Sequence, residues 1–301
     1  MYLGELAAVA TAFCWSLTAM FFSYSGRRIG ADVVNRSRLI FALLFISLSH
    51  LLLQGTLFPL HVEPFRWGWL GLSSILGLVL GDSALFYAYV LLGPRLAMLL
   101  MSLGPIMSTI AGRLLFGEII ALPEMVGIGL TLGGVSWVVT EPRPGQTVVE
   151  NRQYGRGIVA GLLGAAGQSA NLITAKYGLV GGFPPISATW IRLLVGAVVL
   201  WSVTLGRGQV RNTIGSWRDG KALRALLGGT ISGPFLGIWL SLVAVQLARL
   251  GIASTLMALP PVILIPLEYF LFREPVSWRS IAGTLVAIGG VAFIFLSGGG
   301  G

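Results

Sequence analysis

Charged residues are scarce in this chain of 301 residues. Asp, Glu, Lys and Arg make up only 10% of it, whereas 55% is hydrophobic and the mean hydropathy is +0.85. A soluble domain usually carries about 25% charged residues. The composition therefore excludes an ordinary soluble protein and indicates a protein that lies in a membrane.

Cysteine and histidine are almost missing as well. The single cysteine, Cys14, excludes an internal disulfide and a cysteine metal cluster. Residues 167–170 are faintly similar to an intramembrane serine protease motif. That chemistry needs a histidine inside the membrane, and His50 and His61 both fall near one connection. The sequence also has no phosphate-binding loop and no His/Cys metal spacing. We therefore expect no enzyme, no catalytic residue, no metal, no cofactor and no ATP-driven pumping by this chain alone.

Long apolar runs are what the chain has instead. About 20 apolar residues span a bilayer as a helix, and these runs do not alternate as strands of a membrane barrel would. The first run is too long for a signal peptide, and no Lys or Arg precedes it. We predict an all-α polytopic membrane protein with ten transmembrane helices. The runs cover residues 3–25, 33–53, 67–91, 96–115, 122–140, 156–177, 185–205, 223–248, 252–272 and 278–297.

The chain also repeats itself. Residues 70–140 match residues 226–296 at a constant shift of 156, and the earlier parts match with small offsets. Two homologous halves are the usual architecture of a secondary transporter. The matches include Gly77 and Gly81 on Gly233 and Gly237, Pro105 on Pro261, Glu118 on Glu274, Ser16 on Ser169, and Arg38 on Arg192.

The repeat predicts how the chain is divided. We expect the first five-helix repeat over residues 1–141 and a cytoplasmic linker over 142–155. The second five-helix repeat should cover 156–297, and a flexible tail 298–301.

The basic residues predict the orientation. The net charge of +9 could suggest nucleic acid, but 15 of the 20 Lys and Arg fall in the odd-numbered connections and four in the even ones. The positive-inside rule then places the odd connections in the cytoplasm and both termini outside the cytoplasm. An odd number of spans per half makes the two repeats inverted. We expect a multi-pass protein of the plasma (inner) membrane, with the lipid bilayer rather than nucleic acid as its partner.

Small residues spaced four apart predict where helices touch, because lipid gives apolar helices no other reason to pair closely. Such pairs are Gly77/Gly81, Gly233/Gly237, Gly157/Gly161 and Gly129/Gly133. They indicate either static packing or, for the symmetric pair, a rocking contact between the third and eighth spans. Pro234 stands in only one half and could kink the eighth span.

Several motifs resemble those of the ten-helix EamA-type transporters of the drug/metabolite transporter superfamily. The most specific are Leu-Phe-Gly-Glu at 115–118 and Leu-Phe-Arg-Glu at 271–274, each followed by a glycine-rich helix. Residues 84–89 with 101–105 are similar to the family's third-to-fourth helix segment. Trp15-Ser16 resembles its first-helix pair, and Arg38 and Arg192 resemble its second-helix arginine.

The resemblance covers nearly the whole chain. It implies ten helices in two inverted five-helix repeats, a central substrate cavity and, usually, export of small metabolites. Members are often drawn with cytoplasmic termini, whereas the charge count here indicates the reverse, and we follow the charge count.

Asp82 lies deep in the third span. An ionisable group there costs at least about 2.5–3.5 kcal/mol, so it should face a cavity or a partner. The functional reading is a protonatable coupling site or a substrate-amine contact. The structural reading is a hydrogen-bonded Asp, or one in the cytoplasmic half that pairs with a basic loop. Its counterpart in the second half is Ile238, so the site would be asymmetric.

Polar amides and aromatic residues from both halves predict a binding cavity for an amphipathic metabolite. Interhelical hydrogen bonding is the alternative for the amides, and membrane-interface placement for the aromatics. The candidate substrate-binding residues are Trp15, Thr18, Asp82, Phe86, Tyr89, Gln168, Asn171, Trp239 and Gln246.

Other charged residues favour structural roles. Glu118 and Glu274 sit at helix ends beside arginines, as an ion pair or cap would. Arg38, Arg192 and Lys176 lie near span ends and can extend to the membrane surface. We interpret the arginines as anchors, unless the substrate is anionic.

The sequence as a whole predicts a monomeric secondary transporter that exports small amphipathic metabolites such as amino acids. Alternating access around a central cavity would move the solute. The alternatives are a broad drug exporter coupled to protons through Asp82 and, less favoured, a lipid scramblase. Positions where the halves differ, such as Thr18 against Asn171, are where the substrate should bind.

Overall fold

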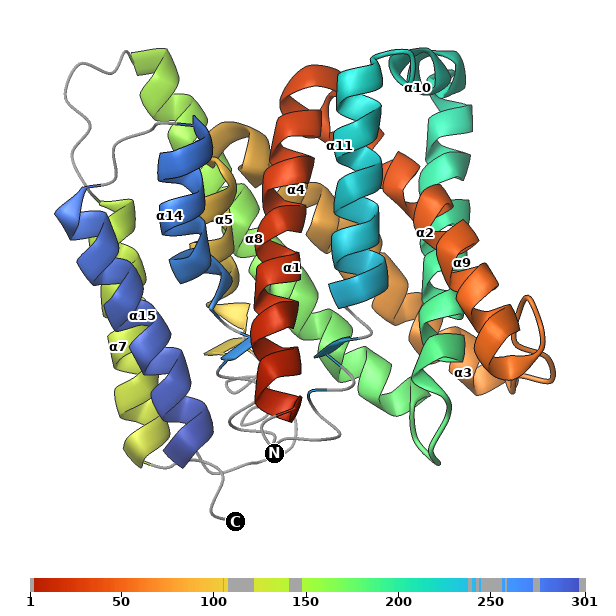
Figure 1. Cartoon of the computed structure of the whole chain (residues 1–301), viewed down its shortest axis with the longest axis horizontal. Coiled ribbons are helices and arrows are strands. Elements are labelled where there is room, and N and C mark those ends of the chain that lie inside the picture. Colours follow the sequence, from red (N-terminus) through yellow and green to blue (C-terminus); the bar gives the residue numbers. More distant parts are fainter. Residues whose placement is uncertain are drawn as a thin grey trace.

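The structure is a computed structural model, and it describes residues 3–104, 106–107, 122–140, 148–237, 240–241, 244, 256–257, 259–272 and 277–297. Its helices pack side by side around a common centre (Figure 1). In chain order they are α1 (Leu3–Ile29), α2 (Ala31–Gln54), α3 (Pro64–Ser74), η1 (Ile75–Gly81), α4 (Asp82–Leu92), α5 (Pro94–Met101), α7 (Leu122–Val139), α8 (Val148–Gly178), α9 (Pro185–Gly206), α10 (Val210–Ser216), α11 (Gly220–Thr230), η2 (Ile231–Gly237), α14 (Pro260–Phe272) and α15 (Trp278–Ser297).

The predicted fold class is confirmed. Among the described residues, five helices are long and apolar enough to cross a bilayer, and the third of them joins α3, η1 and α4 into one span over Pro64–Leu92. Shorter apolar helices cover Met125–Val139 and Trp278–Phe293. The chain is therefore an all-helical polytopic membrane protein. The boundaries of the two repeats and of the linker stay predictions.

The first, third and seventh connections lie at one end of the molecule, and the first two are tight turns on glycine. Gly30 separates α1 from α2 with φ 92°, and Gly93 separates α4 from α5 with φ 84°. These backbone angles favour glycine, which has no Cβ to clash. Both turns and α10 lie at the end opposite to the start of α1 and the end of α15 (Figure 1). This arrangement agrees with clustering of the basic connections on one side, while the side itself stays a prediction.

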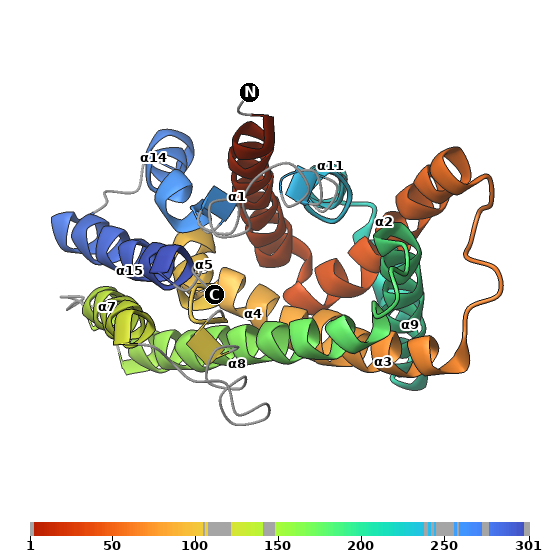
Figure 2. The same cartoon turned by 90° about the horizontal axis from the view of Figure 1, so that it is seen from below.

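The final helices of the two repeats pack on each other reciprocally. α7 and α15 lie side by side in Figures 1 and 2. A Cβ on Gly134 would lie 2.5 Å from the backbone of Gly283 and Ala287, and one on Gly290 would lie 2.6 Å from the backbone of Gly127 and Thr131. The two contacts are related by the shift of 156 in both directions. A reciprocal contact of this kind is the signature of a two-fold relation between the halves.

The third span of each repeat packs on the first helix of the other repeat. η1 lies on α8, where a Cβ on Gly77 would meet Asn171 Cγ at 2.7 Å. η2 lies on α1, where a Cβ on Gly233 would meet the Thr18 hydroxyl oxygen at 2.5 Å. The predicted contact between the third and eighth spans at these glycines is therefore wrong. The close approach that the glycines allow is used between each third span and the opposite first helix.

Both of these segments are π-helical over equivalent residues, Ile75–Gly81 and Ile231–Gly237. π-Helical turns are rare and occur most often at functional sites. Pro234 lies in only the second segment, so proline is not what imposes this geometry.

Glycine spacing alone misidentified one contact. A Cβ on Gly129 or on Gly133 would meet no described residue within 4 Å, so that predicted pair is not a contact between helices in the described part of the chain. The contact face of α7 carries the neighbouring residue, Gly134. The Gly157/Gly161 prediction is confirmed as packing, because these glycines face Leu92 and Leu100.

Adjacent glycines offer a matched test of the α7–α15 contact. Gly134→Ala and Gly290→Ala should each lower stability by about 1–3 kcal/mol, because the added methyl group meets backbone that cannot move aside. Gly133→Ala and Gly289→Ala are the controls, since a Cβ on either lies more than 4 Å from every neighbour that the structure describes. Thermal unfolding of the detergent-purified protein measures the difference. Equal melting temperatures for all four variants would contradict the packing.

Candidate functional site

A cavity of about 490 Å³ lies between the two repeats. Its walls include residues of α1, α2, η1, α4, α5, α8, α9, η2 and α14, so both halves contribute. Binding sites for small molecules commonly measure about 300–1,000 Å³. The space is therefore suited to a small organic solute.

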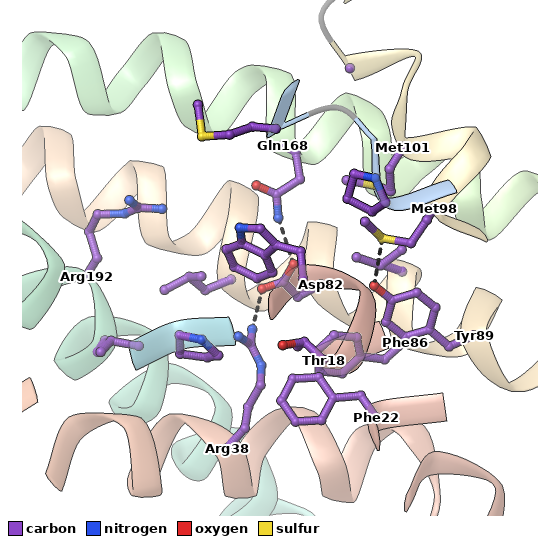
Figure 3. Close-up of a pocket in the computed structure, with 18 of the residues that line it drawn as sticks. Thr18, Phe22, Arg38, Asp82, Phe86, Tyr89, Met98, Met101, Gln168 and Arg192 are labelled. Atoms are coloured by element: carbon purple, nitrogen blue, oxygen red, sulfur yellow. Dashed lines mark hydrogen bonds and ion pairs between the residues drawn. The ribbon is translucent and has the colours of Figure 1, made fainter. Parts of the chain in front are cut away.

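Asp82 stands at the centre of the cavity (Figure 3). It is the first residue of α4, directly after the π-helical segment η1, and it is buried. One carboxylate oxygen forms an ion pair with Arg38 Nη2 from α2. The other accepts a hydrogen bond of 2.7 Å from Gln168 Nε2 on α8. Both partners are donors, so the arrangement suits an ionised carboxylate that links the first repeat to the second.

Amide side chains extend this network to a second arginine. Gln168 Oε1 accepts from Asn171 Nδ2 at 3.0 Å, and Asn171 Oδ1 accepts from Arg192 Nη2 at 2.7 Å. Ser73 also donates to Asn171 Oδ1, at 2.6 Å. The result is a continuous polar chain with Arg38 at one end and Arg192 at the other. These two arginines are the repeat-equivalent pair.

Aromatic and sulfur-containing side chains form the remaining wall. The Phe86 ring stacks on Tyr89 with centroids 5.7 Å apart, and Arg38 lies over Phe86 with its Cζ 4.8 Å from the centroid. The Tyr89 hydroxyl donates to the Met98 sulfur at 3.1 Å. A cation beside an aromatic face is favourable, so this wall also helps to hold Arg38 in the cavity.

The structure brings together most of the residues that the sequence put forward. The predicted residues that line the cavity are Trp15, Thr18, Asp82, Phe86, Tyr89 and Gln168. Asn171 is buried behind Gln168 and reaches the site through it. Thr18 also shares a hydrogen bond of 2.8 Å with Ser232. Their binding of substrate stays a prediction.

Some predictions concern parts that the structure does not describe. Trp239 and Gln246 lie outside the described residues, as do Glu118, Glu274 and Pro105. The same holds for the tail and for the side chain of Lys176.

The arginines are the main correction. We expected Arg38 and Arg192 to be anchors at the membrane surface, yet both line the cavity. Each lies seven residues into its helix, about 10 Å from the start, and each finds polar partners on neighbouring spans. Their recurrence in both repeats, beside a span that contains Asp82, was the signal that could have placed them here. Met98 and Met101 were also missed, because methionine in an apolar run gives no signal of its own.

Comparison with known proteins identifies the family. Residues 2–140 and 155–296 each match the sequence profile of the EamA-like transporter family. The chain belongs to the EamA-like transporter family. EamA-like proteins are membrane transporters of small molecules, which agrees with a solute-sized cavity between the two repeats.

Further comparisons add only the fold. A crystal structure of a protein with 18% sequence identity superposes with a TM-score of 0.65, covering 98% of this chain and 96% of that chain. At this identity the likeness shows a shared fold alone. A comparison with curated proteins found no match.

The ion pair at the centre of this EamA-like cavity can be tested by a double-mutant cycle. Asp82→Asn and Arg38→Gln should each destabilise the protein by about 3–5 kcal/mol, because each leaves the other group buried without its counter-ion. The double variant should lose less than the sum of the two losses. Thermal unfolding in detergent measures the coupling.

A second ion pair in the same chain serves as the control. Arg28 and Asp219 pair at 2.8 Å on the surface, and the cycle of Arg28→Gln with Asp219→Asn should show little coupling. Additive losses for Asp82 and Arg38 would contradict a direct interaction between them.

Proposed function

We propose that this protein is a secondary transporter that exports small amphipathic metabolites, such as amino acids, by alternating access. The observation that carries the proposal is the polar chain from Arg38 through Asp82 and Gln168 to Arg192. It crosses from one repeat to the other inside a solute-sized cavity. Charged groups in a membrane are costly, and function is the usual reason that they are retained.

The two kinds of wall support an amphipathic solute. Arg38, Asp82 and Gln168 can bind polar groups, whereas Phe86 and Met98 present apolar surface. Methionine is flexible and adapts to solutes of different shape. A purely apolar solute would form no polar interaction with the charged groups, and a fully hydrated ion would form no apolar contact with the aromatic wall.

The architecture supports alternating access. Each third span packs on the first helix of the opposite repeat through a glycine contact, at Gly77 in the first repeat and at Gly233 in the second. These two equivalent contacts allow one repeat to rock on the other, which opens the cavity to each side of the membrane in turn. Export is proposed because the family resemblance favours it.

Transport can be tested in liposomes that contain the purified protein. We expect movement of labelled L-leucine, and we expect Gln168→Ala and Asn171→Ala to slow it by about tenfold. Each variant removes one hydrogen bond to a charged partner, which is worth about 1.5–3 kcal/mol. Asn212→Ala, an exposed amide in the α10 segment, is the matched control and should move leucine at the wild-type rate.

Unchanged transport in both cavity variants, at equal amounts of folded protein, would remove these amides from the site. No movement of any amphipathic solute by wild-type protein would contradict the proposed function itself.

A second candidate is a drug exporter coupled to protons, and the placement of Asp82 inside the cavity is what favours it. In that mechanism protonation would release Arg38 from its ion pair. An imposed pH gradient should then drive solute movement by wild-type protein but not by Asp82→Asn. Movement that is insensitive to the gradient would exclude this coupling.

A further inference from the structure

The charges that line the cavity do not cancel. Among the described lining residues, the charged ones are Arg38, Asp82 and Arg192. Arg38 and Asp82 neutralise each other as an ion pair. Arg192 instead faces a neutral amide, because its Nη2 donates to Asn171 Oδ1 at 2.7 Å. The cavity is therefore left with one surplus positive charge, on Arg192.

The guanidinium of Arg192 also has an open hydrogen-bonding position. Its Nε atom is buried and has no hydrogen-bond partner among the described residues. Buried donors nearly always have an acceptor, and one that lacks it is costly to the protein. An acceptor brought by a ligand would remove this cost.

The equivalent residue in the first repeat, Arg38, shows which partners are missing. Arg38 Nε donates to Asn35 Oδ1 at 3.0 Å, and its Nη2 pairs with the Asp82 carboxylate. One amide oxygen and one carboxylate of the protein therefore satisfy the guanidinium on adjoining nitrogens.

The second repeat has neither acceptor. Thr189 stands three residues before Arg192, where Asn35 stands before Arg38, and its hydroxyl donates to the Pro185 carbonyl at 2.8 Å instead. At the position that corresponds to Asp82, the sequence has Ile238. The guanidinium of Arg192 is therefore left with the amide oxygen of Asn171, whereas that of Arg38 has both an amide oxygen and a carboxylate.

We infer that Arg192 binds a carboxylate group of the transported solute, which supplies the oxygen atoms that the second repeat lacks. The inference rests on the proposed function and names its substrate class, solutes with one carboxylate and an apolar body. A guanidinium holds a carboxylate through parallel N–H donors, a geometry that an ammonium or an amide cannot match.

The opposite wall of the cavity accounts for the apolar body. In Figure 3, Arg192 lies on one side, Tyr89, Met98 and Met101 lie on the other, and Asp82 with Gln168 stands between them. A solute whose carboxylate rests on Arg192 would extend its apolar part toward the methionines. The Arg38–Asp82 pair stays intact in this arrangement.

Pairs of solutes that differ only in the carboxylate provide the test. The probes are L-leucine and L-leucinamide, together with N-acetyl-L-leucine and N-acetyl-L-leucinamide. Ligand that binds the folded protein but not the unfolded chain raises the melting temperature, and the rise grows with the ratio of ligand concentration to Kd. We expect both acids to raise the melting temperature of the detergent-purified wild-type protein, and both amides to leave it near the value without ligand.

Variants of Arg192 assign the effect to this side chain. Arg192→Gln should weaken binding of the acids by about 10- to 100-fold, the loss expected for hydrogen bonds to a charged group. Arg192→Lys should bind them with intermediate affinity, since lysine keeps the positive charge but lacks the parallel N–H donors of the guanidinium. Arg36→Gln is the matched control: Arg36 is also a buried arginine with an open Nε, but it contacts Thr204 and Gln209 and does not line the cavity.

Three results would overturn the inference: equal binding of acids and amides by wild type, binding of neither, or undiminished binding of acids by the folded Arg192→Gln or Arg192→Lys variant. The solute pairs need only wild-type protein, so they decide the question even if Arg192→Gln does not fold. Liposome transport separates this failure from failure of the proposed function. If the amides are transported and the acids are not, the proposed transport function is kept and the carboxylate site is refuted. If neither is transported, both the function and the site are refuted.

Discussion

Close approach between each third span and the first helix of the opposite repeat is the contact on which the cavity depends. Glycine permits it on both sides, at Gly77 against Asn171 and at Gly233 against Thr18. Lipid does not drive apolar helices together, so such packing has to come from backbone proximity and hydrogen bonds. Because each third span packs on the first helix of the opposite repeat, neither repeat can form the site alone. Thr18, at one of these contacts, lines the solute cavity, and Asn171, at the other, reaches it through Gln168.

The scaffold is symmetric while the site is not. The π-helical segments, the α7–α15 glycines and the paired arginines all recur in both halves. The carboxylate does not recur, because Asp82 is matched by Ile238. One arginine is thus neutralised by the protein and the other is left for a ligand. A duplicated scaffold can rock as two equal bodies, and an asymmetric lining gives the solute a defined orientation within it.

The sequence was sufficient to predict the membrane class, the helical spans and the repeat. The length and apolarity of the runs indicate helices that span a membrane, and the constant shift of 156 residues indicates the repeat. The sequence was insufficient where a contact depends on which face of a helix a residue occupies. Gly133 and Gly134 are adjacent, yet only Gly134 meets α15. Arg38 and Arg192 could be placed by their depth along the chain, but depth does not show which neighbour a side chain faces. The π-helical turns gave no signal, because Ile75–Gly81 is simply apolar.

The central claim is that the cavity between the repeats opens to each side of the membrane in turn. The single cysteine, Cys14, can be removed as Cys14→Ser, and Met101→Cys then places one thiol in the cavity wall. Labelling by a membrane-impermeant maleimide, applied separately to each face of oriented proteoliposomes, measures the access. Alternating access predicts labelling from both faces, and protection at both faces by a bound solute. Labelling from one face only, under all conditions, would contradict it.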